Sequence, residues 1–61
     1  MKTILGIDCG MNGALAFYDG RELIIYDMPV FERNKTKRVD AIRLADIILL
    51  NKPDFAYIEQ V

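Results

Sequence analysis

Two short hydrophobic segments at opposite ends of this 61-residue chain each finish in an acidic residue. The first is Ile4–Asp8 (ILGID), and the second is Phe55–Glu59 (FAYIE). Nearly continuous apolar runs of this length are typical of strands buried on both faces of a sheet. A carboxylate at the end of such a strand is costly unless it is paired or binds a cation. If the two strands are neighbours, Asp8 and Glu59 lie side by side and form half of a divalent-metal site.

The remaining segments predict a small α/β fold with a mixed sheet. Strands are expected over Thr3–Asp8, Ala14–Tyr18, Glu22–Met28 and Phe55–Gln60, and a helix over Val39–Leu50. The dipeptide Asp19-Gly20 favours a two-residue type I′ hairpin, in which both central residues have φ > 0. The polar and basic segment Glu32–Arg38 is expected to form a loop. The first three strands therefore make an antiparallel meander.

The strand that follows the helix is expected to return beside the first strand and to run parallel to it. The order of the sheet then becomes 3-2-1-4, with the helix over one face. The helix should start at a cap provided by Asp40 or Thr36 and end at Asn51–Pro53. Its expected apolar face is wide and consists of Ala41, Ile42, Leu44, Ala45, Ile48 and Leu49.

Composition excludes several classes of protein. The chain has no histidine and one cysteine, which leaves no Ser-His-Asp or Cys-His pair and no zinc-ligand set. A net charge of −1 argues against a general polyanion binder. No apolar run approaches the roughly 18 residues of a membrane span, so we expect no membrane association. The single cysteine is consistent with a reducing compartment, and we expect a cytoplasmic protein.

Chemistry in this chain must therefore rest on carboxylates and a hard metal ion. Neighbouring strands lie ~4.8 Å apart, so Asp8 and Glu59 on adjacent strands can reach one cation. Mg²⁺ prefers oxygen ligands of this kind and retains several waters. Gly10 and Gly13, directly after Asp8, would let a phosphate approach the backbone closely, although a tight hairpin needs glycines there as well. The plain alternative is that both acids are simply solvated.

A basic cluster precedes the expected helix. It consists of Arg33, Lys35, Lys37 and Arg38. Such a cluster can contact the phosphate backbone, which dominates affinity for nucleic acids. The alternative is an ordinary solvated loop.

These motifs together resemble the RuvC-type Holliday-junction resolvases of the RNase H-like superfamily. The opening motif of that family, Gly-Ile-Asp-Pro-Gly followed by Gly-Ala, is similar to Ile4–Gly10 and Gly13–Ala16. Asp27–Pro29 resembles the end of the family's third strand, and Val39–Ala41 fits the start of its helix. Ala56–Val61 resembles its fourth strand, where Ile-Glu-Gln-Val carries the second catalytic acid. Cys9 stands where the family usually has proline.

The resemblance implies an RNase H-like fold in which Asp8 and Glu59 are the first two catalytic, metal-binding carboxylates. It implies a homodimeric enzyme of bacterial or phage type that cuts four-way DNA junctions with Mg²⁺ or Mn²⁺. The family's remaining acidic ligands and its dimerisation helix come later in the chain than residue 61. We therefore expect residues 1–61 to be the N-terminal part of one nuclease domain, incomplete and inactive alone.

Two other classes of protein remain open. Sugar-kinase and actin-like ATPase half-domains also begin with a strand that ends in Asp-x-Gly and continues into a meander. Their turn usually offers hydroxyl groups to phosphate, whereas Met11, Asn12 and Gly13 offer none, and they do not require an acid at Glu59. The second alternative is a non-catalytic remnant that binds nucleic acid.

Overall fold

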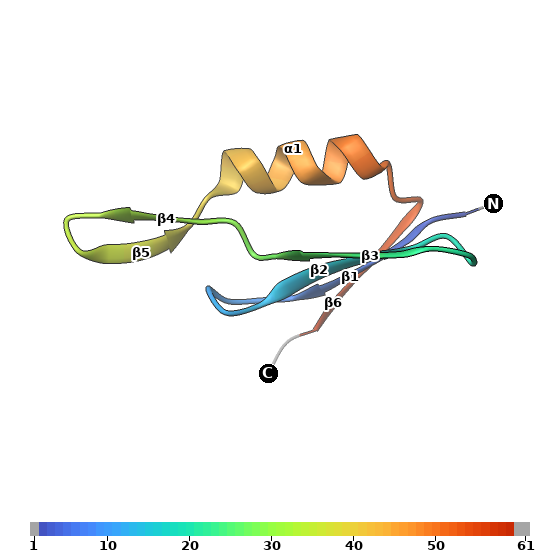
Figure 1. Cartoon of the computed structure of the whole chain (residues 1–61), viewed down its shortest axis with the longest axis horizontal. Coiled ribbons are helices and arrows are strands. Elements are labelled where there is room, and N and C mark those ends of the chain that lie inside the picture. Colours follow the sequence, from blue (N-terminus) through green and yellow to red (C-terminus); the bar gives the residue numbers. More distant parts are fainter. Residues whose placement is uncertain (1, 60–61) are drawn as a thin grey trace.

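The computed structural model describes residues 2–59 and consists of a four-stranded mixed sheet, a separate β-hairpin and one helix (Figure 1). The elements are β1 (Ile4–Asp8), β2 (Ala14–Tyr18), β3 (Leu23–Asp27), β4 (Val30–Arg33), β5 (Thr36–Val39), α1 (Ala41–Asn51) and β6 (Phe55–Glu59). Gln60, the expected last residue of the final strand, lies outside the described residues. The predicted α/β character of the chain is confirmed.

The sheet has the order β3-β2-β1-β6. Strands β1, β2 and β3 pair antiparallel as a meander, and β6 pairs parallel with β1. The four segments expected in the sheet therefore lie beside the expected neighbours. In chain numbering the order is 3-2-1-6 and not 3-2-1-4, because two strands that the sequence did not predict precede the last one.

Those two strands are β4 and β5, so the prediction of a loop over Glu32–Arg38 is wrong. They form an antiparallel hairpin with a tight turn at Asn34 and Lys35, whose φ values are 52° and 62°. Positive φ at both central positions matches the twist of a hairpin. The amide of Asp40 donates to the carbonyl oxygen of Pro29 at 2.9 Å and closes the base of the hairpin.

The turn between β2 and β3 also differs from the prediction. Tyr18 pairs with Leu23, so the connection has four residues and is not a two-residue type I′ turn. Only Gly20 has a positive φ, at 95°. The carboxylate of Asp19 accepts hydrogen bonds from the amides of Glu22 (2.7 Å) and Arg21 (2.8 Å). These bonds hold the pKa of Asp19 below its ordinary value of 3.8.

Helix α1 begins two residues later than predicted, because Val39 belongs to β5. Of the two caps considered, Asp40 is the one used, and its Oδ1 accepts a hydrogen bond from the amide of Arg43 at 3.0 Å. The helix ends at Lys52, which has a left-handed conformation and donates its amide to the carbonyl oxygen of Ile48 at 3.0 Å. Pro53 follows and cannot continue the helix.

One face of the sheet carries the core, and α1 covers it (Figure 1). The buried side chains are Leu5, Leu15, Phe17 and Met28, and partly buried Leu44, Ile47 and Ile48 of the helix pack against them. The expected apolar face of the helix is only partly correct: Leu44 and Ile48 pack against the core, whereas Ala41, Ile42, Ala45 and Leu49 are exposed. Tyr26 joins this side of the sheet in an edge-to-face contact with Phe17, with ring centroids 5.8 Å apart.

The opposite face of the sheet has no covering layer within residues 2–59 (Figure 1). Strand alternation places apolar side chains there too, and six of them are at least 40% exposed: Ile4, Tyr18, Leu23, Ile25, Phe55 and Tyr57. This open face is therefore largely apolar at one end of the sheet and acidic at the other, where the paired residues are Asp27, Ala14, Asp8 and Glu59.

The molecule is elongated. Its radius of gyration is 12.2 Å, whereas a compact chain of this length has one of about 10.5 Å. The extra length comes from the hairpin of β4 and β5, which projects beyond the sheet and the helix (Figure 1). In the part of the chain described, no helix is long and apolar enough to cross a membrane.

Leu15 provides a test of this core. It is fully buried, whereas Leu50 on the helix is 74% exposed. Leu15→Ala should reduce the free energy of unfolding by about 2–5 kcal/mol, from lost burial and the cavity left behind. Leu50→Ala should change it by no more than about 0.5 kcal/mol. Urea unfolding followed by circular dichroism measures both, and equal effects of the two substitutions would contradict the assignment of the core.

Candidate functional site

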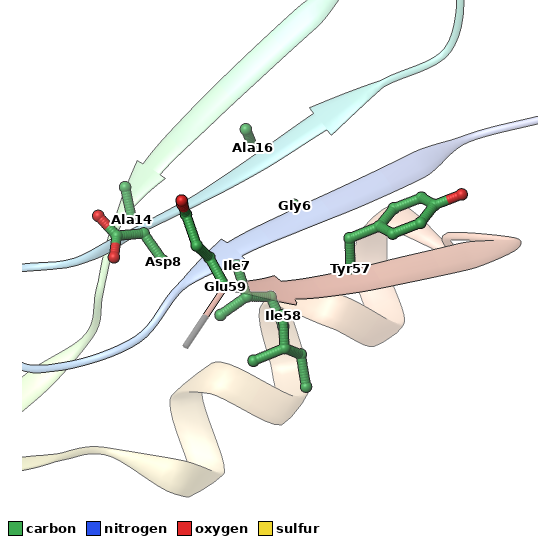
Figure 2. A pocket seen from close by; sticks show the side chains of 8 residues that line it. All are labelled: Gly6, Ile7, Asp8, Ala14, Ala16, Tyr57, Ile58 and Glu59. Carbon is green, nitrogen blue, oxygen red and sulfur yellow. The ribbon is translucent and has the colours of Figure 1, made fainter. Parts of the chain in front are cut away.

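The parallel pairing of β1 and β6 brings the two predicted acids together. Their register places Asp8 directly opposite Glu59, although the two residues are 51 positions apart in the sequence. Both side chains rise from the open face of the sheet, together with Tyr57, while Ile7 and Ile58 point to the helix side (Figure 2). Adjacent strands lie ~4.8 Å apart. Two carboxylates therefore share one corner of the sheet.

The acids border a hollow of about 500 Å³ in the open face. Its lining residues are Gly6, Ile7, Asp8, Ala14, Ala16, Tyr57, Ile58 and Glu59 (Figure 2). The hollow exists because the middle of the central row of side chains is small: Ala16 and Gly6 lie opposite one another, and the larger Ile25 and Tyr57 flank them on the outer strands. A Cβ atom at Gly6 would meet nothing within 4 Å, so its lack of a side chain leaves the floor of the hollow open.

The interpretation of β1 and β6 as buried on both faces is wrong, because one face of the sheet is open. Both Asp8 and Glu59 are exposed, so the cost of burying a charge does not force either of them to find a partner. The remaining reason to expect a cation is that it would offset the repulsion between the two carboxylates. Like charges directly opposite one another on neighbouring strands destabilise the pairing. The side-chain hydrogen bonds found among residues 2–59 do not involve either carboxylate. Their oxygens are therefore open to an external ligand, and this donor set suits a hard divalent cation.

A third acid lies in the same row. Asp27 pairs with Ala14, which pairs with Asp8, so Asp27 is two strands away on the same face, roughly 10 Å at ordinary strand spacing. Its sequence position marks it only as lying near the end of an expected strand, because its place in the row depends on the register of β2 and β3. Among residues 2–59 no three potential ligand side chains are grouped closely enough to hold a metal ion.

Gly10 and Gly13 are both accounted for by the turn after β1. Gly10 has a φ of 109°, and the amide of Gly13 donates to the carbonyl oxygen of Gly10 at 3.1 Å. A Cβ atom on Gly13 would overlap the carbonyl oxygen of Asp8. The turn therefore requires glycine at both positions, and their expected role in admitting a phosphate stays a prediction.

The hairpin distributes the basic cluster over its two faces. Arg33 and Arg38 share a face with Phe31 and Thr36, whereas Lys37 lies opposite Glu32 on the other face. Lys35 occupies the turn. The hairpin begins three residues after Asp27, and it projects from the end of the sheet where the acidic row lies (Figure 1). The two predicted sites are thus at the same end of the molecule.

No protein-family model, curated protein or solved structure gives a significant match to this chain. The resemblance to RuvC-type resolvases, and the RNase H-like assignment with it, stay predictions. What the chain does must be argued from the geometry of its own residues.

Two glycine substitutions test the local geometry of the site. Gly13→Ala forces the new methyl group against the backbone of Asp8, and it should destabilise the protein by about 1–3 kcal/mol or more. Gly6→Ala meets open space and restricts the unfolded chain, so it should be neutral or stabilise by up to about 1 kcal/mol. Thermal unfolding of both variants provides the measurement. A destabilising Gly6→Ala, or a harmless Gly13→Ala, would show that the turn or the floor of the hollow is built differently.

Proposed function

We propose that this chain carries the first two metal-binding carboxylates of a nuclease that hydrolyses phosphodiesters in branched DNA. The proposed class is a RuvC-type Holliday-junction resolvase with an RNase H-like fold, acting in recombination or repair in the cytoplasm. The observation that carries the proposal is the register of β1 and β6, which sets Asp8 opposite Glu59 on the open face. An ATPase half-domain gives no reason for an acid at Glu59.

In this proposal Asp8 and Glu59 are the residues that would hold Mg²⁺ or Mn²⁺. When bound, the cation would activate a water molecule as the nucleophile at neutral pH and offset the negative charge that develops on the phosphate. The carboxylates fix the position of the cation because each is anchored at the end of a hydrogen-bonded strand. They do not bind the DNA themselves, since they repel its phosphates.

The surroundings of the acids suit an approaching phosphodiester. The hollow beside them has a floor of Gly6, Ala14 and Ala16, which offers no bulky side chain to obstruct a nucleic-acid backbone. The hairpin at the same end of the molecule is locally positive, although the chain as a whole has a net charge of −1. Binding would therefore be local to this end.

Two carboxylates can hold one cation, and they hold it weakly. Since the described residues provide no third ligand side chain at this corner, we expect a dissociation constant for Mg²⁺ on the order of 1 mM or weaker. A two-metal centre needs further ligands to fix both ions. These 61 residues alone should therefore not nick a junction. From the resemblance to the resolvases we also propose that the active form is a homodimer.

Metal binding tests the proposal directly. Electron paramagnetic resonance of free Mn²⁺ should show that Asp8→Asn and Glu59→Gln each weaken binding at least tenfold, because each removes one of two charged ligands. Asp46→Asn, on the exposed surface of α1, is the matched control for loss of one charge and should leave binding unchanged. Asp27→Asn tests whether the third acid of the row takes part, and its effect should be small.

Retained Mn²⁺ binding in Asp8→Asn or Glu59→Gln would contradict the proposed site, as would an equal loss in Asp46→Asn. Incubation of the chain with a synthetic four-way junction and Mn²⁺ provides a second check. Metal-dependent nicking that disappears in Asp8→Asn would show that two carboxylates suffice and that the one-cation account is wrong. Saturable binding of ATP in place of junction DNA would favour the ATPase class.

A further inference from the structure

The hairpin of β4 and β5 has one face that no contact with the sheet or the helix explains. Its register pairs Phe31 with Arg38 and Arg33 with Thr36, and these four residues share that face. On the other face, Val30 pairs with Val39, which packs against the core. The first face, here called the Phe31 face, therefore points away from the packed side of the hairpin.

The Phe31 face is a shallow site and not a flat surface. Phe31, Arg33, Asn34, Thr36 and Arg38 line a hollow of about 420 Å³. Phe31 is 42% exposed, which leaves much of its ring available to a ligand. The turn at Asn34 and Lys35 is tight, with both residues at positive φ, so the strands that carry these side chains are held in register. The site is thus preorganised, which lowers the entropic cost of binding.

Charge is also divided unequally between the two faces. The strands place two guanidinium groups and no acid on the Phe31 face, whereas on the other face the charge of Lys37 is balanced by Glu32 directly opposite. Guanidinium groups bind phosphate through two parallel hydrogen bonds, and they are poorly hydrated compared with ammonium groups. Proteins that bind single-stranded nucleic acids combine exposed aromatic rings with basic side chains, because bases stack on the rings and phosphates pair with the charges.

We propose that the Phe31 face binds unpaired nucleotides, with Phe31 stacking on a base and Arg33 and Arg38 contacting the neighbouring phosphates. A nucleotide offers a flat π-face and a phosphate within one unit, whereas an acidic peptide satisfies the arginines but leaves the ring uncovered. Duplex DNA away from a branch hides its base faces in the stack. The inference deepens the proposed function. It rests on that function only where it assigns the unpaired nucleotides to the branch point of the DNA substrate.

A tryptophan reporter tests the stacking. The chain contains no tryptophan, so Phe31→Trp places a single tryptophan in the site, whose fluorescence can be excited selectively over that of the three tyrosines. In EDTA and low salt, an oligothymidylate of about 12 nucleotides should quench its fluorescence in a saturable way. An oligonucleotide of the same length without bases, polyglutamate and a blunt duplex should quench little or not at all. Equal quenching by the abasic strand or by polyglutamate, or no quenching by any probe, would overturn the proposal.

Affinity measurements on separate variants keep the test independent of the reporter. By fluorescence anisotropy with the labelled oligothymidylate, Phe31→Leu should weaken binding about tenfold, since leucine keeps the apolar bulk but cannot stack. Arg33→Gln and Arg38→Gln should each weaken binding and lower the slope of log K against log salt by about 0.7. Lys37→Gln, on the opposite face, is the matched control and should change affinity less than either arginine variant. An unchanged affinity in Phe31→Leu, or an equal effect of Lys37→Gln, would contradict the assignment.

The outcome is separable from that of the metal site, because these measurements contain no divalent cation. Binding at the Phe31 face together with unaltered Mn²⁺ affinity in Asp8→Asn would uphold this inference and refute the proposed function. Loss of Mn²⁺ binding in Asp8→Asn without any DNA binding at the hairpin would uphold the proposed function and refute this inference.

Discussion

The parallel pairing of β1 and β6 is the interaction on which the rest of this structure depends. It closes the crossover through α1 and makes β1 a central strand, and it is supported at its start by two short hydrogen bonds. The amide of Thr3 donates to Asp54 Oδ2, and the amide of Asp54 donates to the carbonyl oxygen of Thr3, both at 2.8 Å. Register matters here, because a slip of one residue would move Glu59 to the helix side of the sheet.

This pairing separates two faces with different roles. The helix closes one face over Leu5, Leu15 and Phe17, and this small core is what stabilises the chain. The other face keeps apolar side chains exposed at one end and acids at the other. Because a domain of this size buries only about 60% of its unfolded surface, its stability is expected to be marginal. The candidate metal site and the Phe31 face lie at the same end of the molecule (Figure 1).

Much of the fold could be predicted from the sequence because its strongest signals are local. Continuous apolar runs located β1 and β6, and Pro53 marked the end of the helix. Asp40 was one of two caps expected at its start, although the helix was predicted to begin at Val39. The hairpin of β4 and β5 was missed because each of its two faces mixes apolar and charged residues, so no alternation of apolar and polar residues marks its strands. The four-residue turn at Asp19 was missed because its side chain bonds to the backbone, which competes with a type I′ turn.

The candidate site was predictable only in part, because only some of its features follow from local sequence signals. The strand-end positions of Asp8 and Glu59 follow from hydrophobic patterns, and their pairing follows from the crossover. Their exposure does not, because it depends on the absence of a second layer over the open face in residues 2–59. The place of Asp27 in the acidic row and the pairing of Phe31 with Arg38 depend on strand register. Register follows from the pattern of apolar residues and from the turns, and the turn after β2 and the whole β4–β5 hairpin were not predicted correctly.

The central claim, that Asp8 and Glu59 act as one cation site, is tested most directly by NMR of the ¹⁵N-labelled chain with trace Mn²⁺. Paramagnetic broadening should be strongest at the amides around Asp8 and Glu59 together, at the ends of β1 and β6, and excess Mg²⁺ should reverse it. Broadening centred on Asp54 or Asp46, or at only one of the two strand ends, would contradict the shared site.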